Sequence, residues 1–159
     1  MTRDEVREAT IEAVQAADEL AAHLERLSSR MASLLPAQPE ALAAWDDDPW
    51  ERLHALLRMF EQLYDLTSRK LFRGFLFLSG EVVGGLSAQN QFRRVEALGG
   101  IESADRWIEI GVTRNILVHD YPTNMPARVQ RANRAWADLP PLIAATRQTI
   151  QALRAEKLI

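Results

Sequence analysis

The sequence predicts an all-α protein, folded as an up-and-down bundle of about five helices. Alanine and leucine dominate its 159 residues, whereas glycine and proline number only seven each, so helix-favouring residues far outnumber helix breakers. Apolar residues recur at spacings of three and four over long stretches, as on one face of a helix. The length suits one domain with a substantial core, and we expect a single helical domain over residues 1–159.

The first predicted helix begins with a capping box, in which Thr2 is the N-cap and Glu5 lies three residues later. Its apolar and small residues follow a heptad repeat, which requires a partner helix along its whole length. Such a partner usually belongs to the same chain, but the face also leaves room for an oligomer interface. Pro36 and Pro39 end the helix, and a loop is expected up to Asp48. The heptad face comprises Val6, Thr10, Ala13, Ala17, Leu20, Leu24, Leu27, Met31 and Leu34.

The second predicted helix begins at Asp48, with Pro49 at the first helical position and Glu51 at the third. It continues to Leu78, and its last two turns are apolar nearly all round, which indicates burial on several sides. Gly80 and the glycines after it end the helix. Its core face is predicted to hold Trp50, Leu53, Leu57, Phe60, Tyr64, Thr67, Leu71, Phe75 and Leu78.

Two further helices have clear caps. A short one is capped by Ser87 and ended by the pair at residues 99–100, which are both glycine. Ser103 caps the next, which Pro122 must end because the residue before a proline is pushed out of the α region. The residues of the short helix that are predicted to point inward are Phe92, Val95 and Leu98.

The final predicted helix, opened by Pro126, contains Val129 and Trp136 on its apolar side. Pro140 and Pro141 are expected to kink this helix, or to split it before residues 142–158. The whole chain is therefore predicted to form two long helices, a short one and two of middling length, joined by short loops.

The chain contains no cysteine, which removes disulfides, thiolate zinc sites and cysteine nucleophiles and is typical of a reducing compartment. Its N-terminus is polar from the second residue, so no signal peptide is expected. The most apolar run, residues 71–79, is too short to span a bilayer and contains Arg73. We therefore expect a cytoplasmic protein without membrane association.

Charge is distributed unevenly along the sequence. The net charge of −3 and a pI near 5.7 argue mildly against nucleic-acid binding by phosphate neutralisation alone. Residues 1–68 hold six basic and fourteen acidic side chains, whereas residues 69–134 hold ten basic and six acidic ones. The middle of the chain can therefore present a positive surface on an acidic protein.

Elimination narrows the candidate chemistry to one short segment. The sequence has no His/Asp/Glu set with metal-site spacing, no glycine-rich phosphate loop after a strand and no G-x-S-x-G motif, so neither a metal nor a cofactor is expected. His23 and His54 lie in mid-helix among charged residues and are interpreted as surface positions. His119 differs, because it lies at a helix end set by Pro122, five residues after Arg114.

The spacing of Arg114 and His119 leaves two interpretations open. Five residues of an ideal helix turn through about 500°, so the two side chains would point about 140° apart. They converge only if the helix loosens near His119, which Pro122 favours, and one cleft holding both would suit a phosphate. Alternatively, both simply cap carbonyls at the helix C-terminus and interact with its dipole. Spacing alone favours this second interpretation.

The whole string is more specific than the spacing. Residues 114–121 read RNILVHDY, which contains the pattern R-N-x-x-x-H and extends it to R-x4-H-x-Y through Tyr121. This pattern resembles the signature of HEPN domains, and the trailing tyrosine is typical of HepT-like toxins. The predicted helical bundle, the position of the motif at the end of a late helix and the helix that follows agree with the resemblance, although its diagnostic residues span only eight positions.

The resemblance implies a metal-independent endoribonuclease that acts as a homodimer, with one R-x4-H motif from each subunit lining a shared cleft. His119 would transfer protons at the 2′-hydroxyl or the leaving 5′-oxygen of RNA. Arg114 would hold the scissile phosphate and stabilise its transition state. Asn115 would orient these groups by hydrogen bonding, with Asp120 in support. An acidic protein of this kind needs a local basic cleft, for which the candidates are Arg93, Arg94, Arg106, Arg128, Arg131 and Arg134.

The resemblance also implies a partner and leaves alternatives. HepT-like toxins are paired with a minimal nucleotidyltransferase antitoxin that adds AMP to the motif tyrosine, and Tyr121 is the matching position. Modification there would place bulk and negative charge beside the cleft, although a helix-end tyrosine can equally pack on its neighbours. The alternatives are a non-catalytic HEPN binding module that partners a nucleotidyltransferase, and a purely structural helical protein. The presence of both Arg114 and His119 favours the nuclease.

Overall fold

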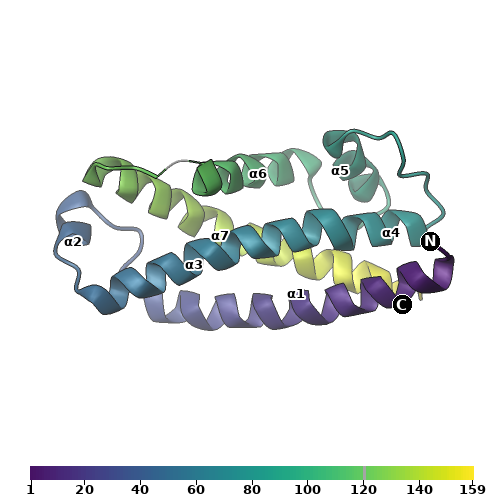
Figure 1. The fold of residues 1–159 in the computed structure, drawn as a ribbon, viewed down its shortest axis with the longest axis horizontal. Coiled ribbons are helices and arrows are strands. Elements are labelled where there is room, and N and C mark those ends of the chain that lie inside the picture. Colours follow the sequence, from purple (N-terminus) through teal and green to yellow (C-terminus); the bar gives the residue numbers. More distant parts are fainter. Residues whose placement is uncertain (120) are drawn as a thin grey trace.

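The chain forms two long rods that lie side by side, with a third long helix behind them and two shorter helices along one edge (Figure 1). The computed structural model describes residues 1–119 and 121–159. Both chain ends lie at the same end of the bundle. In chain order the elements are α1 (Arg3–Met31), α2 (Pro39–Ala43), α3 (Asp47–Leu66), the π-helical segment η1 (Thr67–Leu71), α4 (Phe72–Leu78), α5 (Ala88–Ala97), α6 (Ala104–His119) and α7 (Met125–Ala155).

Helix α1 begins with the predicted capping box. The N–H of Glu5 donates to Thr2 Oγ1 at 3.2 Å, and the N–H of Thr2 donates to Glu5 Oε2 at 2.7 Å. The buried face follows the predicted heptad at most positions, but Val6, Leu20 and Leu34 are only half-buried, whereas Val14 and Ala21 are buried. This face packs against α3, η1 and α4, so the partner that the heptad requires belongs to the same chain.

Of the two long rods, the first is α1 and the second consists of α3, η1 and α4 in one continuous helical run. Its N-cap is Asp46, two residues before the predicted Asp48, and Pro49 fits because N–H groups in the first turn need no intrahelical acceptor. The wide π-turn of η1 inserts an extra residue, which shifts the side chains that follow around the helix axis. Burial of the last two turns on several sides is confirmed, since the buried side chains include Leu71, Phe72, Phe75, Leu76 and Leu78.

The segment between the rods contains a short helix, α2, so the prediction of a loop up to Asp48 is wrong. Pro39 occupies its first turn and Leu42 is fully buried. Tertiary packing therefore stabilises a helix that is too short to show a periodic pattern. The chain just before α2 is tied to α7 by Asn133, whose amide accepts from the N–H of Ala37 and donates to its carbonyl, both at 2.8 Å.

The caps of α5 and α6 are confirmed. The hydroxyls of Ser87 and Ser103 each accept a hydrogen bond from the N–H three residues later, at 3.2 and 3.1 Å. The prediction that Leu98 points inward is wrong, because α5 ends one residue earlier and Leu98 is 40% exposed at its C-cap. Gly99, with φ of +82°, turns the chain away before another helical turn can form.

Helix α7 runs for 31 residues as one helix, so of the two outcomes expected at Pro140 and Pro141, a kink or a split, the split does not occur. Each proline lacks an N–H and crowds the preceding turn, which normally breaks a helix. The neighbouring side chains Leu139, Leu142 and Ile143 are all buried. Their packing in the core outweighs the two lost hydrogen bonds.

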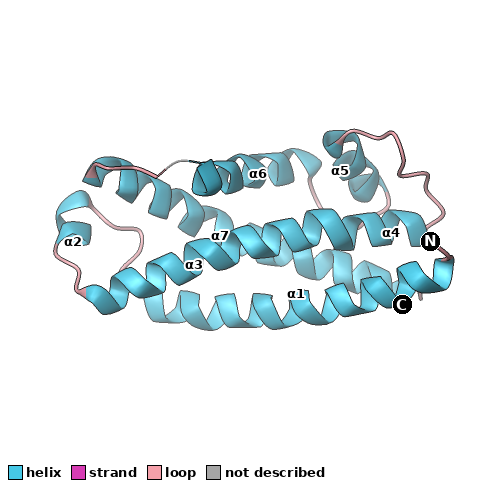
Figure 2. Cartoon of the chain, in the orientation of Figure 1, coloured by secondary structure: helices cyan, strands magenta, loops and turns pink. Residues whose placement is uncertain are grey.

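The buried apolar side chains form one core cluster to which every long helix contributes. If α3, η1 and α4 are taken as one rod, the described part of the chain has six helices, and α2 is the addition to the predicted five. In the part of the chain that the structure describes, Figure 2 shows only helices and loops, which confirms the all-α class. None of the helices in residues 1–119 and 121–159 is both long and apolar enough to cross a membrane.

Candidate functional site

Arg114 is held against α3 by a carboxylate. Its Nε and Nη2 donate to Oδ1 and Oδ2 of Asp65 at 3.0 and 2.9 Å, and its Nη1 donates to Asn115 Oδ1 at 3.2 Å. The side chain of Arg114 is 17% exposed and that of Asp65 is 31% exposed, so the pair is partly shielded from water. The hydrogen bonds to Asp65 raise the pKa of Arg114. The guanidinium is therefore permanently charged, and the bidentate contact fixes its plane.

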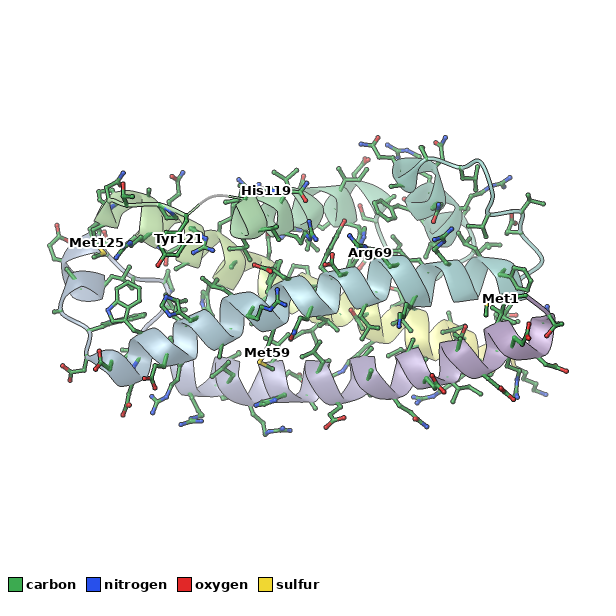
Figure 3. The ribbon with its side chains drawn as sticks, in the orientation of Figure 1. Met1, Met59, Arg69, His119, Tyr121 and Met125 are labelled. Atoms are coloured by element: carbon green, nitrogen blue, oxygen red, sulfur yellow. The ribbon has the colours of Figure 1, made fainter. Side chains whose placement is uncertain are left out.

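Helix α6 stays regular as far as His119, so the predicted loosening of the helix there is wrong. Pro122 restricts only the residue directly before it, which leaves His119 free to remain helical. On this helix Asn115 and His119 lie one turn apart on an outward face, while Arg114 points towards α3. Asn115 and His119 are both exposed, as is Val112 one turn earlier. Figure 3 labels His119 at the outer edge of the bundle. The structure thus brings Arg114 together with Asn115, but not with His119.

The end of α6 is held by two arginines of α7. Nη2 of Arg131 donates to the carbonyl of Leu117 at 2.9 Å, and Nε of Arg128 donates to the carbonyl of Pro122 at 3.1 Å. The donor from Arg131 satisfies a carbonyl in the last turn of α6, of the kind that lacks an intrahelical partner, whereas Arg128 holds the loop that follows the helix. The capping role that one interpretation gave to the motif arginine therefore belongs to α7.

Tyr121 follows the end of α6 and is 77% exposed. Together with Pro122 and Arg128 it lines a small cavity of about 130 Å³ against the start of α3, where His54 also lies. Figure 3 labels Tyr121 beyond His119 along the edge of the bundle. Asp120, the predicted supporting residue, lies outside the described residues.

Arg114 and Asn115 line a cavity of about 370 Å³ between α6, α5 and the α3–η1–α4 rod, which we call the Arg114 pocket. Arg69 and Arg73 line the same pocket from the rod. Among the described residues, three guanidinium groups therefore share the pocket with one carboxylate, that of Asp65, so the described lining is positive.

The six arginines that the sequence suggested for a basic cleft are engaged elsewhere, and none of them lines the Arg114 pocket. The two pocket cations on the rod were missed, because they lie in a helix far from the motif in sequence. The partners of the six are Asp105 for Arg93, Glu81 for Arg94, Asp138 and Glu109 for Arg106, backbone carbonyls for Arg128 and Arg131, and Thr113 for Arg134.

Asp65 was also missed by sequence reasoning. It lies 49 residues before Arg114 in the middle of a helix, and no short motif connects the two. One signal was available, because Asp65 is the only acidic residue between Glu61 and Glu81. A single carboxylate in an apolar and basic stretch of this length is a candidate partner for a distant cation.

The spacing between α3 and α6 is set by a glycine and an aromatic stack. A Cβ at Gly111 would lie 2.5 Å from the hydroxyl oxygen of Tyr64, so a residue without a side chain is needed there. The ring of Tyr64 stacks on Trp107 with centroids 4.8 Å apart. Burial raises the pKa of Tyr64, so its hydroxyl stays protonated at neutral pH. This contact positions Asp65 opposite Arg114.

Comparison with known proteins gave no match to a family model, to a curated protein or to a solved structure. The resemblance to HEPN domains therefore rests on residues 114–121 and on the all-helical fold.

Proposed function

We propose that this protein is an endoribonuclease of the HEPN type, which works as a homodimer and needs no metal ion. The observation that carries the proposal is an R-N-x-x-x-H motif whose Arg114 is fixed and permanently charged, beside Asn115 and with an exposed His119 on the same helix. A cation, a proton-transfer group and correct positioning suffice for this chemistry, because RNA carries its own nucleophile.

In the proposed reaction, the 2′-hydroxyl of RNA attacks the adjacent phosphorus. His119 accepts the proton of the 2′-hydroxyl, and the protonated imidazole of His119, in the same copy or the other, gives a proton to the leaving 5′-oxygen. A bond forms between the 2′-oxygen and phosphorus, and the bond from phosphorus to the 5′-oxygen breaks, which leaves a 2′,3′-cyclic phosphate and a 5′-hydroxyl. Arg114 stabilises the extra negative charge of the transition state, and its fixed orientation means that little reorganisation is needed.

The proposal requires two copies, because Arg114 and His119 of one chain point in different directions. The outward face of α6 carries Asn115 and His119 together with Val112, which is 45% exposed. Exposed apolar side chains next to polar motif residues favour burial against a second copy. A two-fold pairing through this face would align the two α6 helices and bring both motifs to one groove.

The proposed partner is a minimal nucleotidyltransferase antitoxin that transfers AMP to Tyr121. The high exposure of this side chain supports access by a second enzyme. AMP would add bulk and the negative charge of a phosphate close to the motif, which would repel RNA. A toxin and antitoxin of this kind would meet their RNA in the cytoplasm.

A second function is favoured by one observation. Asp65 already offsets the charge of Arg114, and a salt-bridged arginine between two helices is a common structural element. On this interpretation the chain is a non-catalytic HEPN module that binds a nucleotidyltransferase and leaves RNA intact.

The test compares wild type with His119→Ala and Arg114→Ala, with His23→Ala as the matched control because His23 is exposed on α1. Each variant is expressed in cells to score growth, then purified and incubated with total RNA in EDTA. Growth arrest and cleavage are expected for the wild type and the control, with losses of about 100-fold or more in the two motif variants. A folded wild type that leaves RNA intact would refute the nuclease and favour the binding module.

A further inference from the structure

A basic cluster without carboxylate partners lies at the junction of η1 and α4. It consists of Arg69, Lys70 and Arg73, which are all exposed. Among the residues that the structure describes, none of the three takes part in an ion pair, whereas every arginine of α5 and α6 does. The charge of this cluster is therefore available to a ligand.

The three cations face two different surfaces. Arg69 and Arg73 line both the Arg114 pocket and the apolar groove between α1 and α4, whereas Lys70 lines the groove but not the pocket. Figure 3 labels Arg69 on the side of the rod that faces α6. The π-helical turn contributes to this arrangement, because its extra residue shifts the side chains that follow, and such turns are frequent at functional sites.

The chemistry of the pocket suits an oxyanion. Besides the guanidinium groups of Arg69, Arg73 and Arg114, its lining offers the amides of Gln91 and Asn115 as hydrogen-bond donors. The carboxylate of Asp65, which is the one that the described residues contribute to the pocket, already accepts two hydrogen bonds from Arg114. Guanidinium groups bind phosphate oxygens with two parallel hydrogen bonds, so two arginines and a third fixed one form a strong phosphate site.

We propose that Arg69 and Arg73 form a phosphate-binding subsite for the RNA strand, next to the phosphate held by Arg114. The identity of the ligand as RNA rests on the proposed function. Arg69 and Arg73 are four residues apart, about one helical turn, and both line the Arg114 pocket. Two guanidinium groups one helical turn apart can each bind one of two neighbouring phosphates of an RNA strand. A mononucleotide carries its phosphates at one end only and does not offer two phosphates spaced in this way.

The test measures binding of a fluorescent, fully 2′-O-methylated RNA oligonucleotide, which lacks the attacking hydroxyl and so separates binding from cleavage. Wild type is compared with Arg69→Ala/Arg73→Ala over a series of salt concentrations. We expect about a tenfold or greater loss of affinity at physiological salt in the double variant. Each lost phosphate contact lowers the slope of log affinity against log salt by about 0.7 for a single strand, so the slope should fall by about 1.4.

Two controls separate the subsite from general charge. Lys70→Ala removes a cation from the same turn but from the other surface. Arg26→Ala/Arg30→Ala removes two exposed arginines of α1 at the same four-residue spacing. Both controls should bind RNA within about twofold of wild type at the same salt concentration. Arg69→Lys/Arg73→Lys keeps the charge but loses the bidentate contacts, so it should restore the salt slope and only part of the affinity. Thermal unfolding of each variant establishes that it is folded.

The outcomes distinguish the subsite from the nuclease. The subsite is overturned if Arg69→Ala/Arg73→Ala binds the oligonucleotide as well as the controls do, or if wild type does not bind it. Either result holds independently of whether the protein cleaves natural RNA. If the double variant alone loses affinity while wild type never cuts natural RNA, the subsite stands and the nuclease proposal fails. Loss of both binding and cleavage in the double variant supports the two together.

Discussion

Asp65 and Arg114 join α3 to α6 through two parallel hydrogen bonds between residues 49 positions apart in the sequence. A guanidinium has five N–H donors, and three of those of Arg114 are used here, two by Asp65 and one by Asn115. Two N–H groups therefore remain for a phosphate. The carboxylate of Asp65 fixes the orientation of Arg114 and leaves these two donors free. Ion pairing with Asp65 and binding of a phosphate are therefore compatible.

Replacing Asp65 by Asn should weaken this orientation. The amide keeps one acceptor but turns an NH₂ group towards the guanidinium, so one hydrogen bond and the charge are lost. We expect the free energy of unfolding to fall by about 1–3 kcal/mol and kcat for RNA cleavage to fall about 10- to 100-fold. Denaturant unfolding and single-turnover cleavage measure the two effects.

Asp65→Glu is the matched control for that substitution, because it keeps the bidentate carboxylate on a longer side chain. It should recover part of the lost kcat. An Asn variant that is fully folded and cleaves RNA at the wild-type rate would contradict a positioning role for Asp65.

Replacing Gly111 by Ala tests the close approach of α6 to α3. Alanine ordinarily favours a helix over glycine, but here its Cβ would lie 2.5 Å from the Tyr64 hydroxyl. We therefore expect a loss of about 1–3 kcal/mol in unfolding free energy, measured by denaturant titration. Gly84→Ala should be nearly neutral, since nothing lies within 4 Å of a Cβ there. In a Tyr64→Phe background the cost of Gly111→Ala should shrink, and a stabilised Gly111→Ala would rule out the clash.

Replacing Val112 by Lys tests the proposed pairing through the outward face of α6. The side chain is already half exposed, so stability of the folded chain should change by no more than about 0.5 kcal/mol. Burying a charge between two copies would be costly, so the dimer should dissociate in sedimentation velocity. Ala97→Lys, on the exposed side of α5, is the control. Equal masses for wild type and Val112→Lys at one concentration would count against this interface.

Acid should weaken the link between α1 and α7 made by Glu25 and Arg147. The hydrogen bond from Arg147 lowers the pKa of Glu25 below its ordinary value of 4.5. A lowered folded-state pKa adds stability that is present above the ordinary value and is lost as pH falls through the lowered one. Because both side chains are well exposed, the difference between wild type and Arg147→Gln should be about 0.2–1 kcal/mol at pH 7. It should disappear near pH 2, as measured by urea unfolding, and a pH-independent difference would contradict the linkage.

The local signals in the sequence predicted most of the fold. The caps at Thr2, Ser87 and Ser103 are predictable because each one joins two residues that are only three positions apart in the sequence. The continuity of α7 through Pro140 and Pro141 depends on packing across the core, which no local pattern reports.

The candidate site divides in the same way. The motif around Arg114 and His119 is contiguous and was found, and the position of Asn115 beside Arg114 follows from the helix. The relative directions of the Arg114 and His119 side chains depend on where the helix between them ends. Pro122 alone does not determine that end. Asp65 and the arginines of the rod reach the site only through the folding of two helices against each other.

The order of synthesis gives α7 a particular role. It is the last of the described helices to leave the ribosome, and it packs against α1, α2, α3 and α6. At about 5–20 residues per second, its 31 residues take about 2–6 seconds to appear. Until then the end of α6 lacks Arg128 and Arg131, and the nascent chain has no completed site. Until α7 has been made, a chain proposed to cut RNA would therefore lack its completed site, and a partner could bind it during that interval.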